Sequence, residues 1–333
     1  MKSVRFEGGR VVVEVELGFP AAGFAGSLAQ DLERRLRETP GVGDCAVQVT
    51  WKVAAHAVQG PLQPLPGIGN VLAVASGKGG VGKSTTAVNL ALALALDGAR
   101  VGLMDADIYG PSQPRMMGLQ GQHPVSIDGR RMEPLEAYGV KVMSIGFLIE
   151  EEQPMIWRGP MVTQALTQLL KETNWGELDY LVVDMPPGTG DIQLTLGQVV
   201  PVSGAVVVTT PQDIALLDAR KGLKMFQRIN VPVLGIIENM STHVCSNCGH
   251  QEAIFGSGGG ARMAEQYGVR LLARLPLDLR ICEETDSGRP TVIADPDGPI
   301  GRAYRDMARR TAAQLSQAVA GASAFPTITV EES

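Results

Sequence analysis

The sequence predicts an α/β fold with a doubly wound, mostly parallel sheet, preceded by a small α+β module. From Val71 onward, continuous apolar runs alternate with segments of helical period, as in parallel strands covered on both faces. A glycine-rich turn separates the first apolar run from the first helical segment. Before residue 55, apolar and polar residues alternate as in half-buried strands. We therefore expect a main domain at residues 70–325 after a module at residues 1–55.

The module is predicted to contain a strand, a helix and a strand, with room for a short extra strand at its start. Residues alternate between apolar and polar over Val11–Leu17 and again over Val47–Val53. Between them, apolar residues recur at every fourth position from Phe24 to Leu36, which indicates an amphipathic helix that ends near Pro40.

Residues 56–69 have no period and contain Pro61, Pro64 and Pro66, so we interpret them as a linker with a solvated His56. A hairpin-like insertion is expected between Val125 and Phe147, and residues 326–333 are expected to form a flexible tail. The main domain's candidate strands are Val71–Ala75, Arg100–Met104, Tyr180–Val183, Ala205–Thr209, Val233–Ile237 and Leu271–Leu275.

Composition excludes several classes of protein. Apolar residues make up 44% of the chain and charged residues 19%, which predicts a packed core rather than disorder. The formal charge of −6 argues against nucleic acid as the main partner. No apolar stretch reaches about eighteen residues and the N-terminus lacks a signal-peptide core, so we expect no membrane span. With four cysteines in a chain of this size, we expect a cytoplasmic protein with reduced thiols.

The glycine-rich turn matches a P-loop, because it follows an apolar strand and opens a helix. Its glycines let successive backbone N–H groups face phosphates, and the helix dipole adds to the attraction. We predict that Lys83 reaches the β- and γ-phosphates of ATP and that Ser84 ligates Mg²⁺. The loop reads Gly77, Lys78, Gly79, Gly80, Val81, Gly82, Lys83, Ser84 and Thr85. This identifies the main domain as a P-loop NTPase domain.

Carboxylates follow two later strands. Asp105 and Asp107 end one strand, whereas Asp184 ends another and Asp191 follows it by seven residues. The carboxyl ends of parallel strands border the ligand crevice, so these groups should lie beside the γ-phosphate. Asp105 could equally be only a helix cap.

Lys78 makes the loop resemble those of the deviant-Walker ATPases, the group that contains MinD, ParA, the arsenical pump ATPase and the nitrogenase iron protein. The resemblance implies that Lys78 reaches across a homodimer to the partner's nucleotide. It also implies that Asp184 holds Mg²⁺ through water, and that Asp107 orients the attacking water. Asn239 fits the position at which this group contacts adenine, although a turn-forming Asn is the alternative. No guanine-specific motif is present, which favours ATP over GTP.

Cys245 and Cys248 have a spacing at which two thiolates can face one metal. On the residues alone, the pair could be half a zinc knuckle with His243 and His250, a redox pair, or two inert cysteines. Cys45 and Cys282, in other predicted elements, are expected to be structural.

The stretch from Val71 to about Ile293 resembles the Mrp family of iron–sulfur cluster carriers. The resemblance implies a homodimer that holds a [4Fe–4S] cluster between two Cys245/Cys248 pairs, obtains it from donor proteins and passes it to apoproteins. Trp157 and Arg158 would then line the nucleotide interface, or pack as ordinary residues. The matching runs are Ser76–Thr85, Leu103–Ser112, Trp157–Pro160, Asp184–Asp191, Glu238–Met240 and the cysteine pair.

Residues 1–55 resemble the small iron–sulfur-assembly domain of Mrp proteins, here in a truncated copy without the usual leading helix. The rival interpretation is a MinD- or ParA-like positioning ATPase with a structural zinc knuckle. The sequence after Ala320 has no basic amphipathic helix, which argues against MinD-like membrane binding.

Overall fold

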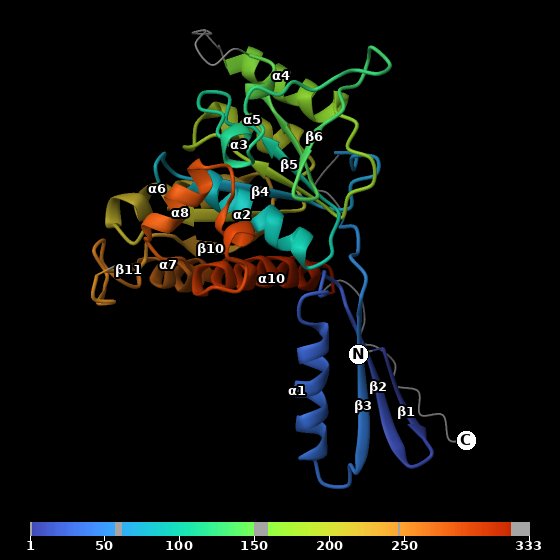
Figure 1. Ribbon diagram of the computed structural model, residues 1–333. Helices are drawn as coiled ribbons and strands as arrows, with labels where there is room; N and C mark the ends of the chain where they lie inside the picture. The colour runs from blue at the N-terminus through green and yellow to red at the C-terminus, as the bar shows by residue number, and fades with distance from the viewer. Residues whose placement is uncertain (1, 57–61, 150–158, 246, 321–333) are drawn as a thin grey trace.

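A central sheet of eight strands organises the part of the chain that the structure describes. The computed structural model describes residues 2–56, 62–149, 159–245 and 247–320 (Figure 1). The strands lie in the order β13-β10-β9-β4-β8-β5-β7-β6, and only the β6–β7 pair is antiparallel. The predicted mostly parallel α/β sheet is confirmed. The strands are β4 (Val71–Ser76), β5 (Val101–Asp105), β6 (Leu135–Ala137), β7 (Val140–Ser144), β8 (Tyr180–Asp184), β9 (Gly204–Thr209), β10 (Val233–Glu238) and β13 (Arg270–Arg274).

Each of the six apolar runs predicted as strands forms a strand, with ends within one residue of the prediction. Every residue of β4, β5, β8 and β9 is buried. Both faces of these strands are covered, which explains why their sequences are continuously apolar instead of alternating.

The hairpin predicted between Val125 and Phe147 is present as β6 and β7, but it is not a separate insertion. Tyr138 and Gly139 form its two-residue turn with φ of 54° and 73°, the positive values that suit a tight hairpin. Because β7 also pairs in parallel with β5, the hairpin widens the central sheet.

Helices flank the sheet in two groups (Figure 1). Helix α2 packs against α9, α10 and the central strands, whereas α6 packs against α5 and α7. Thr86–Leu94 of α2 is buried throughout, so this helix is apolar on nearly every side. The helices are α2 (Lys83–Leu96), α3 (Gln113–Met116), α4 (Gly159–Glu172), α5 (Asp191–Val199), α6 (Asp213–Arg228), α7 (Gly259–Tyr267), α8 (Leu279–Asp286), α9 (Thr291–Ala294) and α10 (Pro299–Ala320), with a 3₁₀ turn at Ile145–Phe147.

The N-terminal module projects from the body below α10 in Figure 1. Its sheet has the order β1-β2-β3, with β1 antiparallel and β3 parallel to β2. Val13, Cys45 and Val47 are buried, and the Cys45 thiol donates to the Glu33 carbonyl of α1 at 3.5 Å. β1 is the short extra strand for which the sequence left room. Cys45 lies in the module's small core. The elements are β1 (Ser3–Glu7), β2 (Arg10–Leu17), α1 (Ala25–Arg37) and β3 (Asp44–Trp51).

A backbone hydrogen bond and a cation–π contact join the module to the C-terminal end of α2 and to α10. The Ala22 amide donates to the Asp97 carbonyl at 2.9 Å. The buried Asp97 carboxylate accepts from Arg309 of α10 at 2.7 and 3.0 Å, and the Arg309 guanidinium lies 4.6 Å from the centre of the Phe24 ring. The module therefore rests on the same helix whose other end forms the P-loop.

The prediction of a solvated His56 is wrong. Its side chain is buried, and Nδ1 contacts the Asn70 side-chain oxygen just before β4. Trp157, Arg158 and the tail at residues 326–333 lie outside the described residues. None of the described helices combines the length and the apolar character needed to cross a bilayer.

Candidate functional site

The glycine-rich loop connects β4 to α2 and shapes a cavity at the carboxyl edge of the sheet. Gly80 and Gly82 have φ of 78° and 82°, which residues with a Cβ rarely adopt. Gly77 lies against the Asp218 backbone of α6, where a Cβ would overlap it. Val81 is buried, and the other loop residues from Lys78 to Thr85 line an open cavity of about 290 Å³ together with Asp107.

Lys83 brings three of the predicted side chains together. Its Nζ lies 2.5 Å from Asp184 Oδ1 and 3.6 Å from Asp107 Oδ2. It also donates to Ser84 Oγ at 3.2 Å. Hydroxyl and carboxylate oxygens are the ligands that Mg²⁺ prefers, so the donor set suits that ion.

Asp105 is fully buried between the site and α3. It faces Asp184 in the register of β5 and β8. Its carboxylate accepts from the amides of Asp107, Ser112 and Gln113 at 3.1, 3.0 and 3.1 Å. Two of these amides lie at the start of α3, so Asp105 satisfies helix-end donors from a distance, although the N-cap residue itself is Ser112.

Burial of Asp105 and of Asp107 disfavours the ionised forms of these two carboxyl groups. It raises the pKa of Asp105 to about 7, with the Asp184 charge as a further cause. Burial also raises the pKa of Asp107, although the Lys83 ammonium opposes this. Two carboxylates thus contact one lysine and Asp105 lies beside Asp184, so a divalent cation would relieve the repulsion among them.

Lys78 lines the cavity and is half-buried. Its carbonyl accepts from Ser76 Oγ at 2.8 Å, which holds the loop in place. Within the described ranges, its ammonium has no hydrogen-bonding or ion-pair partner. The charge is therefore free to meet a group from outside this chain.

Asn239 follows β10 and is buried behind the P-loop. Its Nδ2 donates to the Val81 carbonyl at 2.9 Å, and its backbone amide donates to Thr209 at 2.8 Å. The side chain approaches Gly82 so closely that a Cβ at residue 82 would meet it. In this structure, Asn239 supports the loop from behind and does not line the phosphate cavity.

Cys245 and Cys248 lie on the turn of a two-stranded hairpin at one end of the molecule (Figure 1). The hairpin consists of β11 (His243–Val244) and β12 (Gln251–Glu252). Cys248 is exposed and Cys245 half-buried. The backbone N–H groups of Cys248 and Asn247 lower the pKa of the Cys245 thiol, which favours the metal-binding thiolate.

Neither histidine of the predicted zinc knuckle completes a metal site with these thiols. His243 Nδ1 lies 3.2 Å from the Leu277 carbonyl, and His250 is exposed beyond the turn. In the portion of the chain that is described, no three His, Cys, Asp or Glu side chains are grouped to hold a metal ion. One chain thus offers a pair of thiols on an open surface.

Two family comparisons match almost the whole chain. A family model described as ParA, NUBPL iron-transfer P-loop NTPase, matches residues 67–312. The chain belongs to the NUBPL iron-transfer P-loop NTPase family. A second model, described as iron–sulfur cluster assembly protein, matches residues 1–49. The predicted family resemblances are confirmed for both parts.

Relatives of this NUBPL-family chain have closely similar sequences. It is 57% identical over 278 residues to an iron–sulfur cluster carrier protein of Pseudomonas fragi, covering 83% of this chain and 97% of that one. It is 51% identical over 255 residues to the iron–sulfur cluster transfer protein NUBPL of Mus musculus, covering 76% and 80%.

Solved structures agree with the fold. A nucleotide-binding protein from Archaeoglobus fulgidus, in complex with ADP, has a TM-score of 0.60 and 39% identity, covering 67% of this chain and 87% of that one. The cell division ATPase MinD of Pyrococcus furiosus has a TM-score of 0.55 at 22% identity, covering 73% and 98%, and supports the fold alone.

Sequence reasoning missed Gln113 in this NUBPL-family site. Its Nε2 donates to Asp184 Oδ2 at 2.9 Å and to the Ser84 carbonyl at 3.2 Å, and its side chain is fully buried. Gln113 thereby positions the carboxylate predicted to hold Mg²⁺. In the sequence, Gln113 stands directly after the Leu103–Ser112 run that matches the Mrp family and directly before Pro114. That position could have marked it as part of the site.

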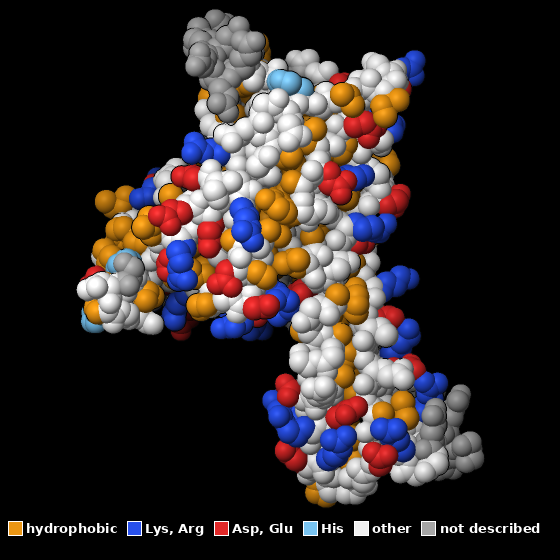
Figure 2. Space-filling view, viewed as in Figure 1, with side chains coloured by type: hydrophobic (Ala, Val, Ile, Leu, Met, Phe, Trp, Pro, Cys, Tyr) orange, Lys and Arg blue, Asp and Glu red, His pale blue; other side chains and the backbone are white. Residues whose placement is uncertain are grey.

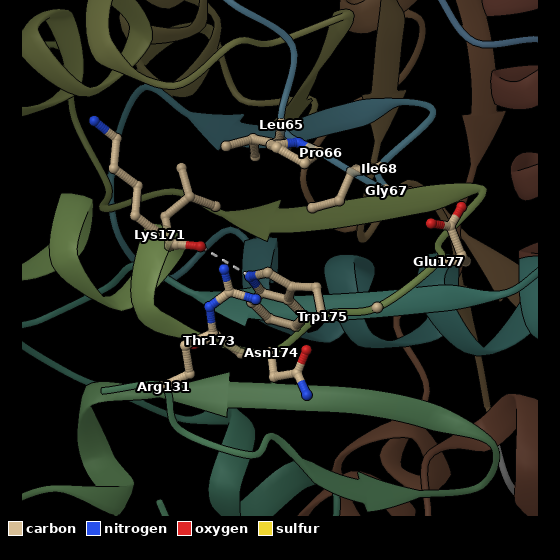
Figure 3. Close-up of a pocket in the computed structure, with 12 residues that line it drawn as sticks. Leu65, Pro66, Gly67, Ile68, Arg131, Lys171, Thr173, Asn174, Trp175 and Glu177 are labelled. Carbon is tan, nitrogen blue, oxygen red and sulfur yellow. Dashed lines mark hydrogen bonds between the residues drawn. The ribbon is translucent and has the colours of Figure 1, made fainter. Parts of the chain in front are cut away.

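A second cavity, of about 270 Å³, lies at the opposite edge of the sheet (Figure 3). Trp175 forms one wall, and its Nε1 donates to the Leu170 carbonyl at 3.0 Å. Ile68, next to this wall, precedes β4, so this cavity borders the amino ends of the strands. Ligands of parallel α/β sheets bind at the carboxyl ends, which favours the P-loop cavity as the family's nucleotide site.

Proposed function

We propose that this chain is an ATP-hydrolysing carrier that binds a [4Fe–4S] cluster at a homodimer interface and transfers it to apoproteins. The cluster is its cargo, obtained from donor proteins, and ATP is its substrate. The observation that carries the proposal is the exposed Cys245/Cys248 turn in a chain whose P-loop is complete. A protein with both features can bind a thiolate-ligated cargo and a nucleotide at once.

The cavity favours a nucleoside triphosphate with Mg²⁺. Lys83 neutralises phosphate charge, while Ser84 and Asp184 would hold the metal, which supplies charge neutralisation at the γ-phosphate. Among the described residues, the Asn239 side chain bonds only the Val81 carbonyl, which leaves its oxygen and one N–H for an adenine edge. The relative from Archaeoglobus fulgidus, solved with ADP, supports a nucleotide in this place.

Two-fold symmetry supports the cluster proposal. A [4Fe–4S] cluster takes four thiolates, and one chain offers two on this turn. A second copy supplies the same pair without further residues. Cys45 is buried in the module and Cys282 lies on α8, so neither belongs to this turn. Four free thiols also suit a reducing compartment, and we place the carrier in the cytoplasm.

Transfer is tested with the reconstituted protein. After anaerobic loading, the chain is mixed with an apoenzyme whose activity needs a [4Fe–4S] cluster. Recovery of that activity without free iron or sulfide in solution is the expected result. A loaded protein that never restores the apoenzyme would contradict the carrier role while leaving cluster binding intact.

Asp107→Ala should abolish ATP hydrolysis while nucleotide affinity changes less than about threefold. Asp107 lies 3.6 Å from Lys83 and lines the cavity, where it can orient the attacking water. A positioned base contributes about 10²–10⁴-fold to a rate. Single-turnover hydrolysis and fluorescent-nucleotide titration measure the two effects. Normal hydrolysis in this variant would remove Asp107 from the mechanism.

Lys78 is expected to act on the partner's nucleotide, because its ammonium has no partner among the described residues of its own chain. Lys78→Ala and Asp107→Ala homodimers should both be inactive. Mixed dimers should recover part of the activity, since one of their two composite sites is intact. The measurement is steady-state ATP turnover of purified, differently tagged heterodimers. Inactive heterodimers would count against action in trans.

A further inference from the structure

A basic cavity of about 310 Å³ lies between α5 and α6, apart from both sites described above. Lys221, Lys224 and Arg228 line it from α6, and all three are exposed. Their spacing of three and four residues puts them on one face of the helix. The remaining lining comes from Thr189, Gly190, Asp191, Leu194 and Met225.

The charge of this cavity is unbalanced. Lys221 pairs with Asp218 at 2.9 Å, and Asp191 is the acidic residue in the lining. In the described part of the chain, Lys224 and Arg228 have no hydrogen-bonding or ion-pair partner. Figure 2 shows acidic and basic side chains interspersed over the visible face, and the whole chain carries −6. Unpaired cations around a hollow favour an anionic ligand.

The lining also limits the kind of anion. Leu194 and the nearly buried Met225 add apolar surface, which a free phosphate would leave uncovered. A basic stripe that follows a nucleic acid can make about 6–10 phosphate contacts, whereas this cluster has three cations on about two turns of helix. A peptide that carries both acidic and apolar side chains matches both parts of the lining.

The cavity shares one loop with the nucleotide site. Pro187 lines the phosphate cavity and Thr189 lines the basic one, two residues apart. Between them, the Gly188 amide donates to the Ser76 carbonyl at 3.0 Å, at the start of the P-loop. The Thr189 methyl faces Gly222 of α6, where an added Cβ would lie 3.8 Å from it. A ligand in the basic cavity would therefore touch the loop that follows Asp184.

We propose that the cavity formed by Lys221, Lys224 and Arg228 binds an acidic, partly apolar segment of a partner protein and thereby senses or adjusts the loop beside the nucleotide. The binding is independent of cluster carriage. Its effect on ATP turnover rests on the function proposed above, so binding and turnover are measured separately.

The test uses the full chain and a fluorescein-labelled peptide of alternating Glu and Leu residues, followed by fluorescence anisotropy. The wild-type chain should bind the peptide, more weakly as salt rises. The double variant Lys224→Ala/Arg228→Ala should lose at least about tenfold in affinity, since two charge-assisted contacts are removed. The control double variant Lys52→Ala/Arg270→Ala removes two exposed cations elsewhere and should bind as wild type.

Three results would overturn the proposal: no peptide binding, equal affinity in the two double variants, or tighter binding of a DNA oligonucleotide that the Lys224/Arg228 variant abolishes. Thermal unfolding of each variant verifies that the fold is kept. If the peptide binds as expected but no ATP turnover is found with or without it, the ATPase proposal fails and the binding site stands.

Discussion

Lys83→Ala is expected to lower ATP turnover by at least about 10²–10³-fold, comparable to the loss of one transition-state charge partner. Lys83 is the cation that meets Asp184 at 2.5 Å and lines the phosphate cavity. Its ammonium is buried there, so water screens it little and its interaction with phosphate is strong. Steady-state phosphate release at saturating ATP measures the effect.

Two controls separate the chemistry from folding. Removing Lys83 also leaves Asp184 and Asp107 without their ammonium, which costs stability when buried charges lose a partner. Thermal unfolding of Lys83→Ala with and without Mg²⁺ measures this loss of stability. Lys83→Gln removes the charge but preserves most of the side-chain volume. Lys52→Ala, on the exposed surface of the module, should retain full turnover. Near-normal turnover in folded Lys83→Ala would mean that the P-loop does not catalyse hydrolysis.

The central sheet was predictable because its signal is local. Six apolar runs such as Tyr180–Val183 are strands because two layers of helices bury them, and burial on both faces leaves a continuous apolar pattern. The position of Asp105 and Asp184 followed from the rule that parallel strands end at one edge. These inferences need only sequence order and periodicity.

Other features depend on tertiary contacts that no local pattern contains. Gln113 acts through Asp184, 71 residues away, and a glutamine beside a proline looks like a solvated loop residue. His56 is buried because Asn70 faces it, although its surroundings in sequence are those of a linker. The hairpin formed by β6 and β7 could be predicted from the sequence. The pairing of β7 with β5 could not, because it depends on which strand lies at the edge of the sheet.

The thiol pair could be predicted from the sequence only in part. The spacing of Cys245 and Cys248 indicated that both sulfurs could face one metal. The structure adds that the turn is exposed and that His243 is engaged with the Leu277 carbonyl. The contact engages only Nδ1 and leaves His243 Nε2 able to bind a metal, so it does not decide against a zinc knuckle within one chain. The exposed turn is a surface at which two copies can meet.

Cys245→Ala and Cys248→Ala are each expected to abolish [4Fe–4S] binding. A two-fold interface turns each single substitution into the loss of two of four thiolate ligands. After anaerobic reconstitution, the wild-type chain should be brown, with about four irons and four sulfides per dimer. Each variant should be colourless and free of iron. Absorption spectroscopy with iron and sulfide analysis measures the outcome, and size-exclusion chromatography tests whether the loaded form is the dimer.

The histidines supply the discriminating control for that experiment. A zinc site within one chain would use Cys245, Cys248, His243 and His250, a legitimate tetrahedral set. The double variant His243→Ala/His250→Ala should therefore keep the full iron content if the cluster is held by thiolates alone. Cys282→Ala, on α8, should also keep it, because that exposed thiol lies outside the turn. One colourless zinc per monomer, lost when the histidines are replaced, would exclude the shared cluster and favour the zinc knuckle.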